Sequence, residues 1–392
     1  MTSLVIIGST GSIGRSALEV VEKHLPDVRI IGLAAGKKAE SLAEQILRHR
    51  PKVVSVSDPE VAERVSELIK QGNSDKNYQP EVLVGIDGLK ELARMPQADT
   101  VLVSVAGSIG TWPAWEAVRA GKRLALATKE ALVLLGDLLM TEAEKCGAEI
   151  IPVDSEHSAL FQLLRGTNSA EIKSLWLGAS GGPFREADPK ALDNITPAEA
   201  LAHPVWKMGP KVTVDSATLM NKGLEIIEAR WLFDVPQKDI KVVIHPQGLV
   251  HAMVELVDGS ILMHAGLPDM KAPIAYAISH PERAVGVLGS LDLAEVGMLI
   301  FEQPSVERFP CLGLARKALD IGGTAPTALN AADEVAVEAF LEEKIPFTAI
   351  PRLIETVLDS HKPDKVTSPE VALDADRRAR ERAWELVGKF RK

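Results

Sequence analysis

The chain opens with an apolar run at residues 4–7, followed directly by Gly8-Ser9-Thr10-Gly11-Ser12-Ile13-Gly14. Apolar residues then recur at helical spacing from Ile13 to Leu25. Glycines in such a turn let the backbone bend sharply and approach a pyrophosphate, and the following helix offers free N–H groups and a partial positive charge. The stretch therefore predicts the first strand, turn and helix of a dinucleotide-binding domain. A glycine-rich turn without a ligand is the alternative.

The same alternation continues through the first 150 residues. Further strand-like runs stand at residues 30–33, 53–56, 101–103, 123–126 and 150–153, with helical stretches between most of them. Strands that alternate with helices predict a parallel sheet with crossover helices. Arg123 and Pro152 interrupt the last two runs. We therefore expect an α/β fold whose first domain, at residues 1–150, is a Rossmann-like parallel sheet.

The pattern changes after Val153. Runs at residues 250–256 and 261–263 flank Asp258-Gly259, which is a hairpin signal, and residues 218–233 have apolar residues at helical spacing. We expect an α+β domain at residues 151–300 and a linker at residues 301–312. Helical stretches at residues 310–319, 328–341, 350–358 and 369–387 predict a C-terminal helical bundle, which we place at residues 313–392.

Composition restricts the class of protein. Lysine and arginine total 44 and aspartate and glutamate total 54, so the net charge is −10, which disfavours nucleic acid as the main partner. Two cysteines, Cys146 and Cys311, exclude a disulfide framework and a four-cysteine zinc site. No apolar run approaches about 18 residues, so we expect no membrane span. No signal peptide is visible, and we expect a reduced, cytoplasmic compartment.

The second predicted strand indicates which dinucleotide is bound. Sites that prefer NAD(H) place a carboxylate about 20 residues past the glycines, where it holds the ribose 2′-hydroxyl. Here that region reads Ala34-Ala35-Gly36-Lys37-Lys38, and the first carboxylate is Glu40. Two lysines suit a 2′-phosphate, so NADP(H) is favoured. The alternative is that both lysines belong to a solvated loop.

Carboxylates follow the last strand of the predicted sheet, in Asp154-Ser155-Glu156. Two carboxylates at one strand end repel each other unless a cation lies between them. Glu225, on the predicted helix at residues 218–233, is a third candidate, and three oxygen ligands favour Mg²⁺ or Mn²⁺ over Zn²⁺. The alternative is that Ser155 caps a helix at residues 156–164.

Hydroxyl, amide and ammonium groups gather near the predicted helix at residues 218–233. Ser216 precedes that helix, and Asn221 and Glu225 share one face with Lys222 beside them. The opposite face has an apolar stripe of Met220, Leu224, Ile227 and Trp231. Ser180-Gly181-Gly182 offers a similar hydroxyl and open N–H groups after another strand. These groups predict a site for a substrate phosphate, with ordinary caps and glycine turns as the alternative.

Two further segments have polar side chains in loop positions. His203-Pro204-Val205-Trp206-Lys207-Met208-Gly209 is bounded by proline and glycine, as in a lid that closes over substrate; the alternative is a loop pinned to the core by Trp206. Thr128-Lys129-Glu130 follows a predicted strand, where a lysine meets cofactor or substrate or forms a surface pair with its neighbour. His245 and His251 stand near the hairpin, where we expect structural histidines.

Taken together, these segments resemble one enzyme family in their amino-acid sequences and in their order along the chain. They are GSTGSIG at residues 8–14, AGK at 35–37, KE at 129–130, PVDSEH at 152–157, ASGGPF at 179–184, HPVWKMG at 203–209, VDSATLMNKGLEIIEARWLF at 214–233, HPQ at 245–247 and PDM at 268–270. The set resembles the 1-deoxy-D-xylulose 5-phosphate reductoisomerases of the non-mevalonate isoprenoid pathway, from residue 3 to about residue 345. PVDSEH and VDSATLMNKGLE are the specific blocks.

The resemblance implies an NADPH domain, a central catalytic and dimerisation domain with a flap near residues 200–210, a C-terminal bundle, and a homodimer. It implies that 1-deoxy-D-xylulose 5-phosphate is rearranged to a branched aldehyde, which NADPH reduces to 2-C-methyl-D-erythritol 4-phosphate.

The resemblance also assigns roles to individual residues. The divalent metal would be held by Asp154, Glu156 and Glu225. The sugar backbone would be positioned by Lys129, Ser155 and Glu156, and the phosphate by Ser180, Ser216, Asn221 and Lys222. His203 and Trp206 would lie on the flap, and His251 near the active site. NADPH would be contacted by Thr10, Gly11, Ser12, Ile13, Gly36, Lys37, Glu130 and Gly209.

The chain departs from the family pattern at a few positions. Thr128 and Lys38, which we also expect beside the cofactor, stand where the family usually has Asn, and Gly248 stands where it has Ser. Ala131 and Ser158 replace a common Ser and Asn. None of these changes removes an expected metal ligand.

Two other functions fit part of the pattern. Another NADPH oxidoreductase, such as a homoserine dehydrogenase or a semialdehyde dehydrogenase, has the same domain order, and the latter acylates a cysteine. A non-enzymatic NADPH sensor or scaffold would use the helical bundle as a partner surface, but it leaves the three carboxylates and the phosphate cluster without a role.

Overall fold

The computed structural model describes residues 2–73, 75 and 77–391. The chain divides into two compact units. Unit 1 comprises Met1–Ala131, Leu139–Ser158 and Asp269–Gly289, and unit 2 comprises Leu132–Leu138, Ala159–Pro268 and Ser290–Lys392. Among the described residues, no helix is both long and apolar enough to cross a membrane.

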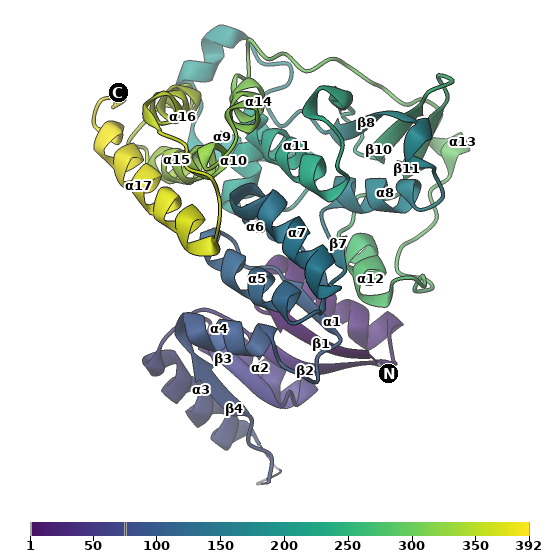
Figure 1. The fold of residues 1–392 in the computed structure, drawn as a ribbon, viewed down its shortest axis with the longest axis vertical. Coiled ribbons are helices and arrows are strands. Elements are labelled where there is room, and N and C mark those ends of the chain that lie inside the picture. Colours follow the sequence, from purple (N-terminus) through teal and green to yellow (C-terminus); the bar gives the residue numbers. More distant parts are fainter. Residues whose placement is uncertain (1, 74, 76, 392) are drawn as a thin grey trace. The chain divides into compact units, whose positions relative to one another are not determined.

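Unit 1 is built on a parallel sheet of seven strands (Figure 1). The strands are β1 (Thr2–Ile7), β2 (Val28–Ala34), β3 (Val53–Val56), β4 (Glu81–Val84), β5 (Thr100–Val103), β6 (Arg123–Leu126) and β7 (Ile150–Pro152). Their order is β4-β3-β2-β1-β5-β6-β7. The predicted α/β class is confirmed. The sequence prediction missed β4, whose residues are half-buried or exposed, because an edge strand lacks the apolar run of a central one.

Helices connect the strands of unit 1 or, in the case of α12, pack beside them. They are α1 (Ser12–His24), α2 (Ala39–His49), α3 (Pro59–Gly72), α4 (Gly85–Ala93), α5 (Thr111–Arg119), α7 (Asp137–Cys146) and α12 (Lys271–Ser279), while α6 (Lys129–Leu135) crosses the boundary between the units. Helix α1 buries Ala17, Val20 and Val21, the stripe that its helical spacing predicts. Strand order reverses at β1, which pairs with β2 on one side and β5 on the other. Such a switch point is where open parallel sheets bind ligands.

The two interrupted strands form as predicted. Arg123 begins β6, and its guanidinium leaves the sheet to pair with Glu149 at 2.9 Å and to donate to the His280 carbonyl at 2.6 Å. Pro152 lies in β7, which is the last strand of the sheet order, where a missing N–H removes no necessary ladder bond. Val153 lies beyond the end of β7, so the predicted strand was one residue too long.

Unit 2 contains a four-stranded sheet in the order β11-β10-β8-β9. Its strands are β8 (Ile172–Ala179), β9 (Ile240–Ile244), β10 (Val250–Leu256) and β11 (Ile261–Ala265). The predicted Asp258-Gly259 hairpin joins β10 to β11 in antiparallel pairing. Gly259 has φ of +89°, which glycine adopts without strain. Strand β9 was not predicted; it pairs in parallel with β8.

The helix predicted at residues 218–233 is broken. Helix α10 (Pro210–Thr218) and helix α11 (Met220–Leu232) meet at Leu219, whose φ of +61° is left-handed. Ser216 therefore lies in the last turn of α10, and its predicted place ahead of a helix N-terminus was wrong. Of the predicted buried stripe, Met220, Leu224 and Ile227 are buried, and Asn221 contacts Glu225 on the other face as predicted. The opposite face is buried as well, since Lys222, Glu225 and Glu228 are buried.

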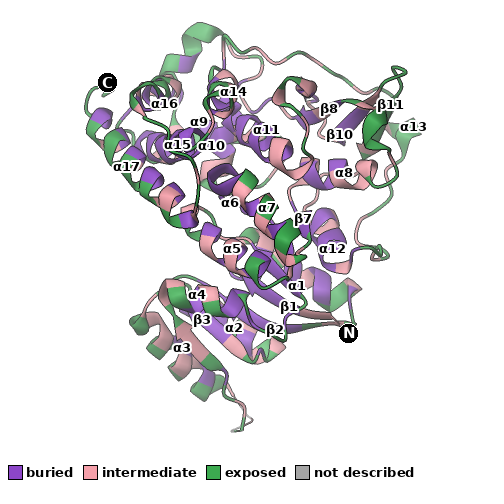
Figure 2. Cartoon of the chain, viewed as in Figure 1, coloured by how far each residue is buried: buried purple, intermediate pink, exposed green. Residues whose placement is uncertain are grey.

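Unit 2 also contains a helical bundle. The helices of the bundle are α14 (Cys311–Ile321), α15 (Ala325–Leu341), α16 (Ala349–Ser360) and α17 (Pro369–Val387). Shorter helices elsewhere are α8 (Ser155–Leu164), which begins in unit 1, α9 (Pro197–Ala200) and α13 (Leu293–Val296). The stripe Ala372, Ala375, Ala379, Ala383 and Leu386 of α17 is buried. Small residues let α17 approach the almost wholly buried α15 (Figure 2).

Candidate active site

The turn after β1 is tight enough to require glycine. Gly8 has φ of +95°, and a Cβ there would lie 2.8 Å from the carbonyl oxygen of Ser104, the residue after β5. A Cβ on Gly14 would lie 2.3 Å from the Gly8 carbonyl oxygen. Gly11 caps α1 without a side chain, so nothing from the cap residue covers the first N–H groups of the helix. Thr10 is buried in this turn, while Ser12 is exposed.

Gln45 on α2 holds this turn from the side. The Ser9 hydroxyl donates to Gln45 Oε1 at 2.7 Å, and Gln45 Nε2 donates to the Ser9 carbonyl at 3.0 Å. Ser9 is wholly buried. Gln45 was not predicted from the sequence, because a glutamine on an amphipathic helix belongs to no recognisable motif.

The segment between β2 and α2 is exposed, as a cofactor site requires. Gly36, Lys37 and Lys38 are all exposed, and a Cβ on Gly36 would meet nothing within 4 Å. Lys38 is the cap residue of α2 and forms no side-chain cap hydrogen bond. A lysine side chain has no oxygen to accept a helix N–H, so Lys38 adds a charge at the start of α2 and no side-chain cap.

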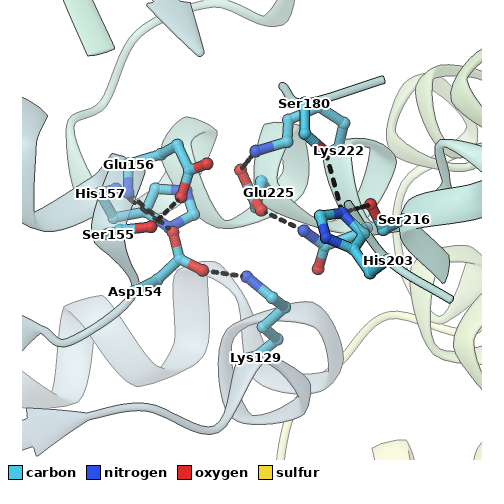
Figure 3. A network of polar contacts seen from close by, with 11 residues as sticks. Lys129, Asp154, Ser155, Glu156, His157, Ser180, His203, Ser216, Lys222 and Glu225 are labelled. Atoms are coloured by element: carbon cyan, nitrogen blue, oxygen red, sulfur yellow. Dashed lines mark hydrogen bonds and ion pairs between the residues drawn. The ribbon is translucent and has the colours of Figure 1, made fainter. Parts of the chain in front are cut away.

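Thr128, Lys129 and Glu130 each have a partner within unit 1. Thr128 Oγ1 donates to the Val105 carbonyl at 2.7 Å. Glu130 Oε1 accepts the N–H of Gly107 at 2.9 Å. Lys129 Nζ donates to Asp154 Oδ2 (Figure 3). The Lys129 and Asp154 side chains are only 14% and 16% exposed, so the alternative of a solvated surface pair is wrong.

Asp154, rather than Ser155, caps α8. Asp154 Oδ1 accepts the N–H groups of Glu156 and His157 at 3.2 and 3.4 Å. The Ser155 hydroxyl donates to Glu156 Oε2 at 2.6 Å, so the predicted Ser155 cap was wrong. The cap uses Oδ1, whereas Oδ2 accepts the hydrogen bond from Lys129.

Glu225 is a deeply buried acid of unit 2. It is 0% exposed, and its two oxygens accept hydrogen bonds from Asn221 Nδ2 and Lys222 Nζ, each at 2.6 Å. Lys222 is itself 4% exposed. A carboxylate this deeply buried needs a cation or several donors to remain charged. The structure therefore places Asn221 and Lys222 on Glu225, and their contact with a phosphate stays a prediction.

His203 joins two predicted phosphate ligands in unit 2. Its Nε2 lies 2.9 Å from Ser180 Oγ and 3.1 Å from Ser216 Oγ (Figure 3). Its Nδ1 accepts the backbone N–H groups of Val205 and Trp206, so the proton of the neutral ring lies on Nε2. Burial lowers the pKa of His203 below its ordinary value of 6.5. A Cβ on Gly182 would lie 2.8 Å from the Ser216 carbonyl oxygen, so the two serine segments approach closely.

The rest of the predicted flap lies beside this cluster. The Trp206 and His251 rings are 6.3 Å apart, centre to centre. Gly209 is exposed and is the N-cap residue of α10. His251 is 9% exposed. His245 Nδ1 lies 2.8 Å from the Ile300 carbonyl oxygen, and its ring stacks on Phe301, which confirms a structural role for His245.

Neither cysteine has the setting of a nucleophile. Burial raises the pKa of the Cys311 thiol well above its ordinary value of 9.0. Cys146 lies on α7, and its Sγ is 3.8 Å from a Glu142 oxygen. The acyl-cysteine alternative therefore finds no support in the described residues.

Family models match most of the chain. Residues 4–136 match the model for 1-deoxy-D-xylulose 5-phosphate reductoisomerase, and residues 150–233 match its C-terminal domain model. Residues 265–382 match a DXP reductoisomerase C-terminal domain. The chain belongs to the 1-deoxy-D-xylulose 5-phosphate reductoisomerase family. The oxidoreductase class expected from the sequence is thereby confirmed.

Members of this family match over nearly their full length. The reductoisomerase of Thermodesulfovibrio yellowstonii is 46% identical over 99% of this chain and 100% of its own. That of Symbiobacterium thermophilum is 48% identical over 97% and 98%. The Zymomonas mobilis enzyme, solved with NADPH, superimposes with a TM-score of 0.91 at 37% identity, covering 98% of this chain and 99% of its own. A reductoisomerase complex with NADPH, fosmidomycin and magnesium gives 0.92 at 40% identity, covering 99% and 98%.

Proposed function

We propose that this enzyme converts 1-deoxy-D-xylulose 5-phosphate to 2-C-methyl-D-erythritol 4-phosphate in the non-mevalonate isoprenoid pathway. The substrate is rearranged within the molecule and then reduced with NADPH. The observation that carries the proposal is the Ser180–His203–Ser216 cluster of hydroxyls around a neutral histidine. In a chain that belongs to this family, such a cluster suits a phosphate monoester.

A divalent cation fits the carboxylates that the sequence analysis selected. We assign one divalent ion to Asp154, Glu156 and Glu225, which offer oxygen ligands only and so favour Mg²⁺ or Mn²⁺. Glu225 is wholly buried, so it is predisposed to pair with positive charge. When bound, the ion supplies Lewis acidity toward the substrate carbonyl and the adjacent hydroxyl oxygens.

The residues of this chain orient the substrate around that ion. We assign the sugar hydroxyls to Lys129, Ser155 and Glu156, and the phosphate to Ser180, Ser216, Asn221 and Lys222. His203 would donate from Nε2, since Nδ1 is held by backbone N–H groups. Trp206 would close over the bound substrate and exclude water, with His251 behind it.

NADPH fits the carboxyl end of the unit 1 sheet. The pyrophosphate would lie against Thr10, Gly11, Ser12 and Ile13 at the start of α1, where backbone N–H groups face solvent. Gly36, Lys37 and Lys38 would receive the ribose 2′-phosphate. Thr128, Glu130 and Gly209 complete the proposed contacts. Apart from Gly209, cofactor binding would belong to residues 1–150. We assign the chemistry to residues 151–300 and the helical bundle to residues 313–392.

A homodimer fits the exposed edge of the unit 2 sheet. Strand β11 is the last strand in its sheet order, and Ile261, Leu262 and Met263 are 46%, 39% and 47% exposed (Figure 2). Consecutive apolar residues on an open edge are a liability in a monomer. We propose that a second copy of the chain covers them. Light scattering should give the mass of a dimer, and Met263→Lys should shift it toward the monomer.

We place the enzyme in the cytoplasm, where NADPH and free thiols such as Cys146 are maintained.

The first experiment follows NADPH oxidation with 1-deoxy-D-xylulose 5-phosphate, with and without Mg²⁺ or Mn²⁺, and with NADH in parallel. We expect turnover that needs the metal and uses NADH poorly. Intact NADPH binding without turnover would refute the proposed substrate and leave the cofactor assignment standing.

A further inference from the structure

Lys211, Asp215 and Asp333 form a buried charged cluster in unit 2 that the proposed reaction does not use. Lys211 and Asp215 lie one turn apart on α10, and Asp333 lies on α15. Lys211 Nζ is 2.7 Å from Asp215 Oδ2 and 2.8 Å from Asp333 Oδ2. The Asp215 and Asp333 side chains are 2% and 0% exposed. One cation thus serves two buried carboxyl groups on two helices.

A single lysine does not balance two buried carboxylates. Burying a second negative charge costs far more free energy than taking up a proton. One of two such buried acids therefore holds a proton. Among the described residues, neither Asp215 Oδ1 nor Asp333 Oδ1 has a hydrogen-bond partner. A proton on one carboxyl group would supply the missing donor to the other and bring the cluster to neutrality.

The surroundings of the cluster support this protonation. Burial, and next the charge of Asp333, raise the pKa of Asp215 well above its ordinary value of 3.8. The groups that face Asp215 are Lys211 on its own helix, Asp333 on α15 and the Cys311 thiol on α14. The thiol is neutral because burial raises its pKa. The neighbouring Glu334 pairs with Arg380 of α17 at 2.8 Å, so it adds no free charge.

The cluster lies next to a proposed phosphate ligand. Asp215 directly precedes Ser216 in the last turn of α10, before the left-handed residue Leu219. The Ser216 hydroxyl lies 3.1 Å from His203 Nε2. Because α10 packs on α15 through Lys211 and the two acids, the cluster sets where the last turn of α10 places Ser216.

We propose that Asp215 and Asp333 share one proton beside Lys211 and act as positioning residues, which hold α10 and Ser216 in place for the substrate phosphate. The positioning role rests on the proposed function, since it takes a phosphate as the ligand of Ser216. The shared proton does not rest on the proposed function. An Asp→Asn substitution mimics the protonated acid, because an amide is uncharged and has a donor, whereas Asp→Ala removes the contact.

The first test measures unfolding temperature against pH for the unmodified chain and for Asp215→Asn. The folded chain binds the Asp215 proton more tightly than the unfolded chain, so it loses stability as pH rises from 3.8 toward the raised pKa. Asparagine has no such proton to lose. We expect the unfolding temperature of Asp215→Asn to rise relative to that of the unmodified chain as pH rises from about 5 to about 8. A difference that stays constant over this range would overturn the shared proton.

The control for this test is Asp359→Asn. Asp359 lies on the surface, where it pairs with Lys317 at 2.6 Å. We expect its unfolding curve to stay parallel to that of the unmodified chain. The measurement needs no turnover, so its outcome is independent of the proposed reaction.

The second test compares Asp333→Ala with Asp333→Asn in steady-state kinetics. Loss of the contact should raise the KM for 1-deoxy-D-xylulose 5-phosphate about tenfold, with little change in kcat or NADPH affinity. Asp333→Asn keeps an oxygen that can face Lys211 Nζ, so its KM should return to within about twofold of the unmodified value. An unchanged KM in a folded Asp333→Ala variant would refute positioning. A KM raised about tenfold in a folded Asp333→Asn variant would refute it too, even where the alanine variant fails to fold.

Discussion

His203 Nδ1 accepts the backbone N–H of Trp206 at 2.8 Å, so the histidine ring and the proposed flap are one hydrogen-bonded structure. A protonated ring would present an N–H to the Val205 and Trp206 donors and break both bonds. Burial already lowers the pKa of His203 below 6.5. The loop is therefore most stable above that pH and loosens as pH falls through the lowered pKa.

The KM for 1-deoxy-D-xylulose 5-phosphate should accordingly rise on acidification, on the order of tenfold by one unit below the pKa of His203. NADPH affinity should change less over the same range, because Gly209 is the only residue of this loop that we assign to NADPH. Steady-state kinetics between mildly acidic and neutral pH would check this. His203→Gln should flatten the pH dependence, and a variant that retains it would assign the effect to another group.

Asp154→Asn should remove metal binding while leaving the start of α8 intact. Asparagine keeps an oxygen that accepts the N–H groups of Glu156 and His157, but it loses the charge that attracts the ion. We expect Mn²⁺ affinity to fall at least about tenfold, with kcat falling strongly. Mn²⁺ titration by electron paramagnetic resonance measures the first quantity, and an unchanged affinity would remove Asp154 from the ligand set.

Gln45→Leu should weaken NADPH binding, although Gln45 itself faces Ser9 rather than the proposed ligand. Two hydrogen bonds to a buried residue are lost, and the turn that presents the α1 N-terminus loses its lateral support. A fall in affinity of about tenfold is expected by fluorescence titration. Glu44→Gln, on the exposed side of α2, is the matched control and should bind NADPH normally.

Lys37→Ala should reduce the preference for NADPH over NADH. The side chain is exposed at the end of the unit 1 sheet, so its loss should leave the unfolding temperature unchanged. An exposed charge pair contributes about 1 kcal/mol or less, which predicts a loss of selectivity of about fivefold. Kinetics with both cofactors would test this, and equal losses for NADPH and NADH would show that Lys37 does not meet the 2′-phosphate.

Iodoacetamide should leave turnover unchanged. Cys311 is buried and its pKa is raised, so it presents no thiolate, and Cys146 lies on α7 beside an acidic residue. Full activity after alkylation of Cys146, verified by mass spectrometry, is the expected result. Loss of activity in proportion to alkylation would restore the thiol mechanism.

The sequence was sufficient for the main elements of the fold. The central strands of unit 1 and the four C-terminal helices were predicted because their apolar periodicity is local and strong. The glycine turn was also predicted from local sequence. Its pattern is visible there because Gly8 and Gly14 lie against backbone atoms that exclude any side chain. Strands β4 and β9 were missed, because an edge strand or a short one depends on its neighbours more than on its own pattern.

Only the tertiary structure decided the environment of the polar residues. The sequence placed Ser216 before a helix and Glu225 on a polar face, whereas the break at Leu219 puts Ser216 at a helix end and burial surrounds Glu225. The Asp154 cap, the Gln45 contact with Ser9 and the approach of Asp333 to Asp215 were not predictable from spacing. Each depends on residues far apart in the chain or on one hydrogen-bond geometry among several, and packing alone selects between them.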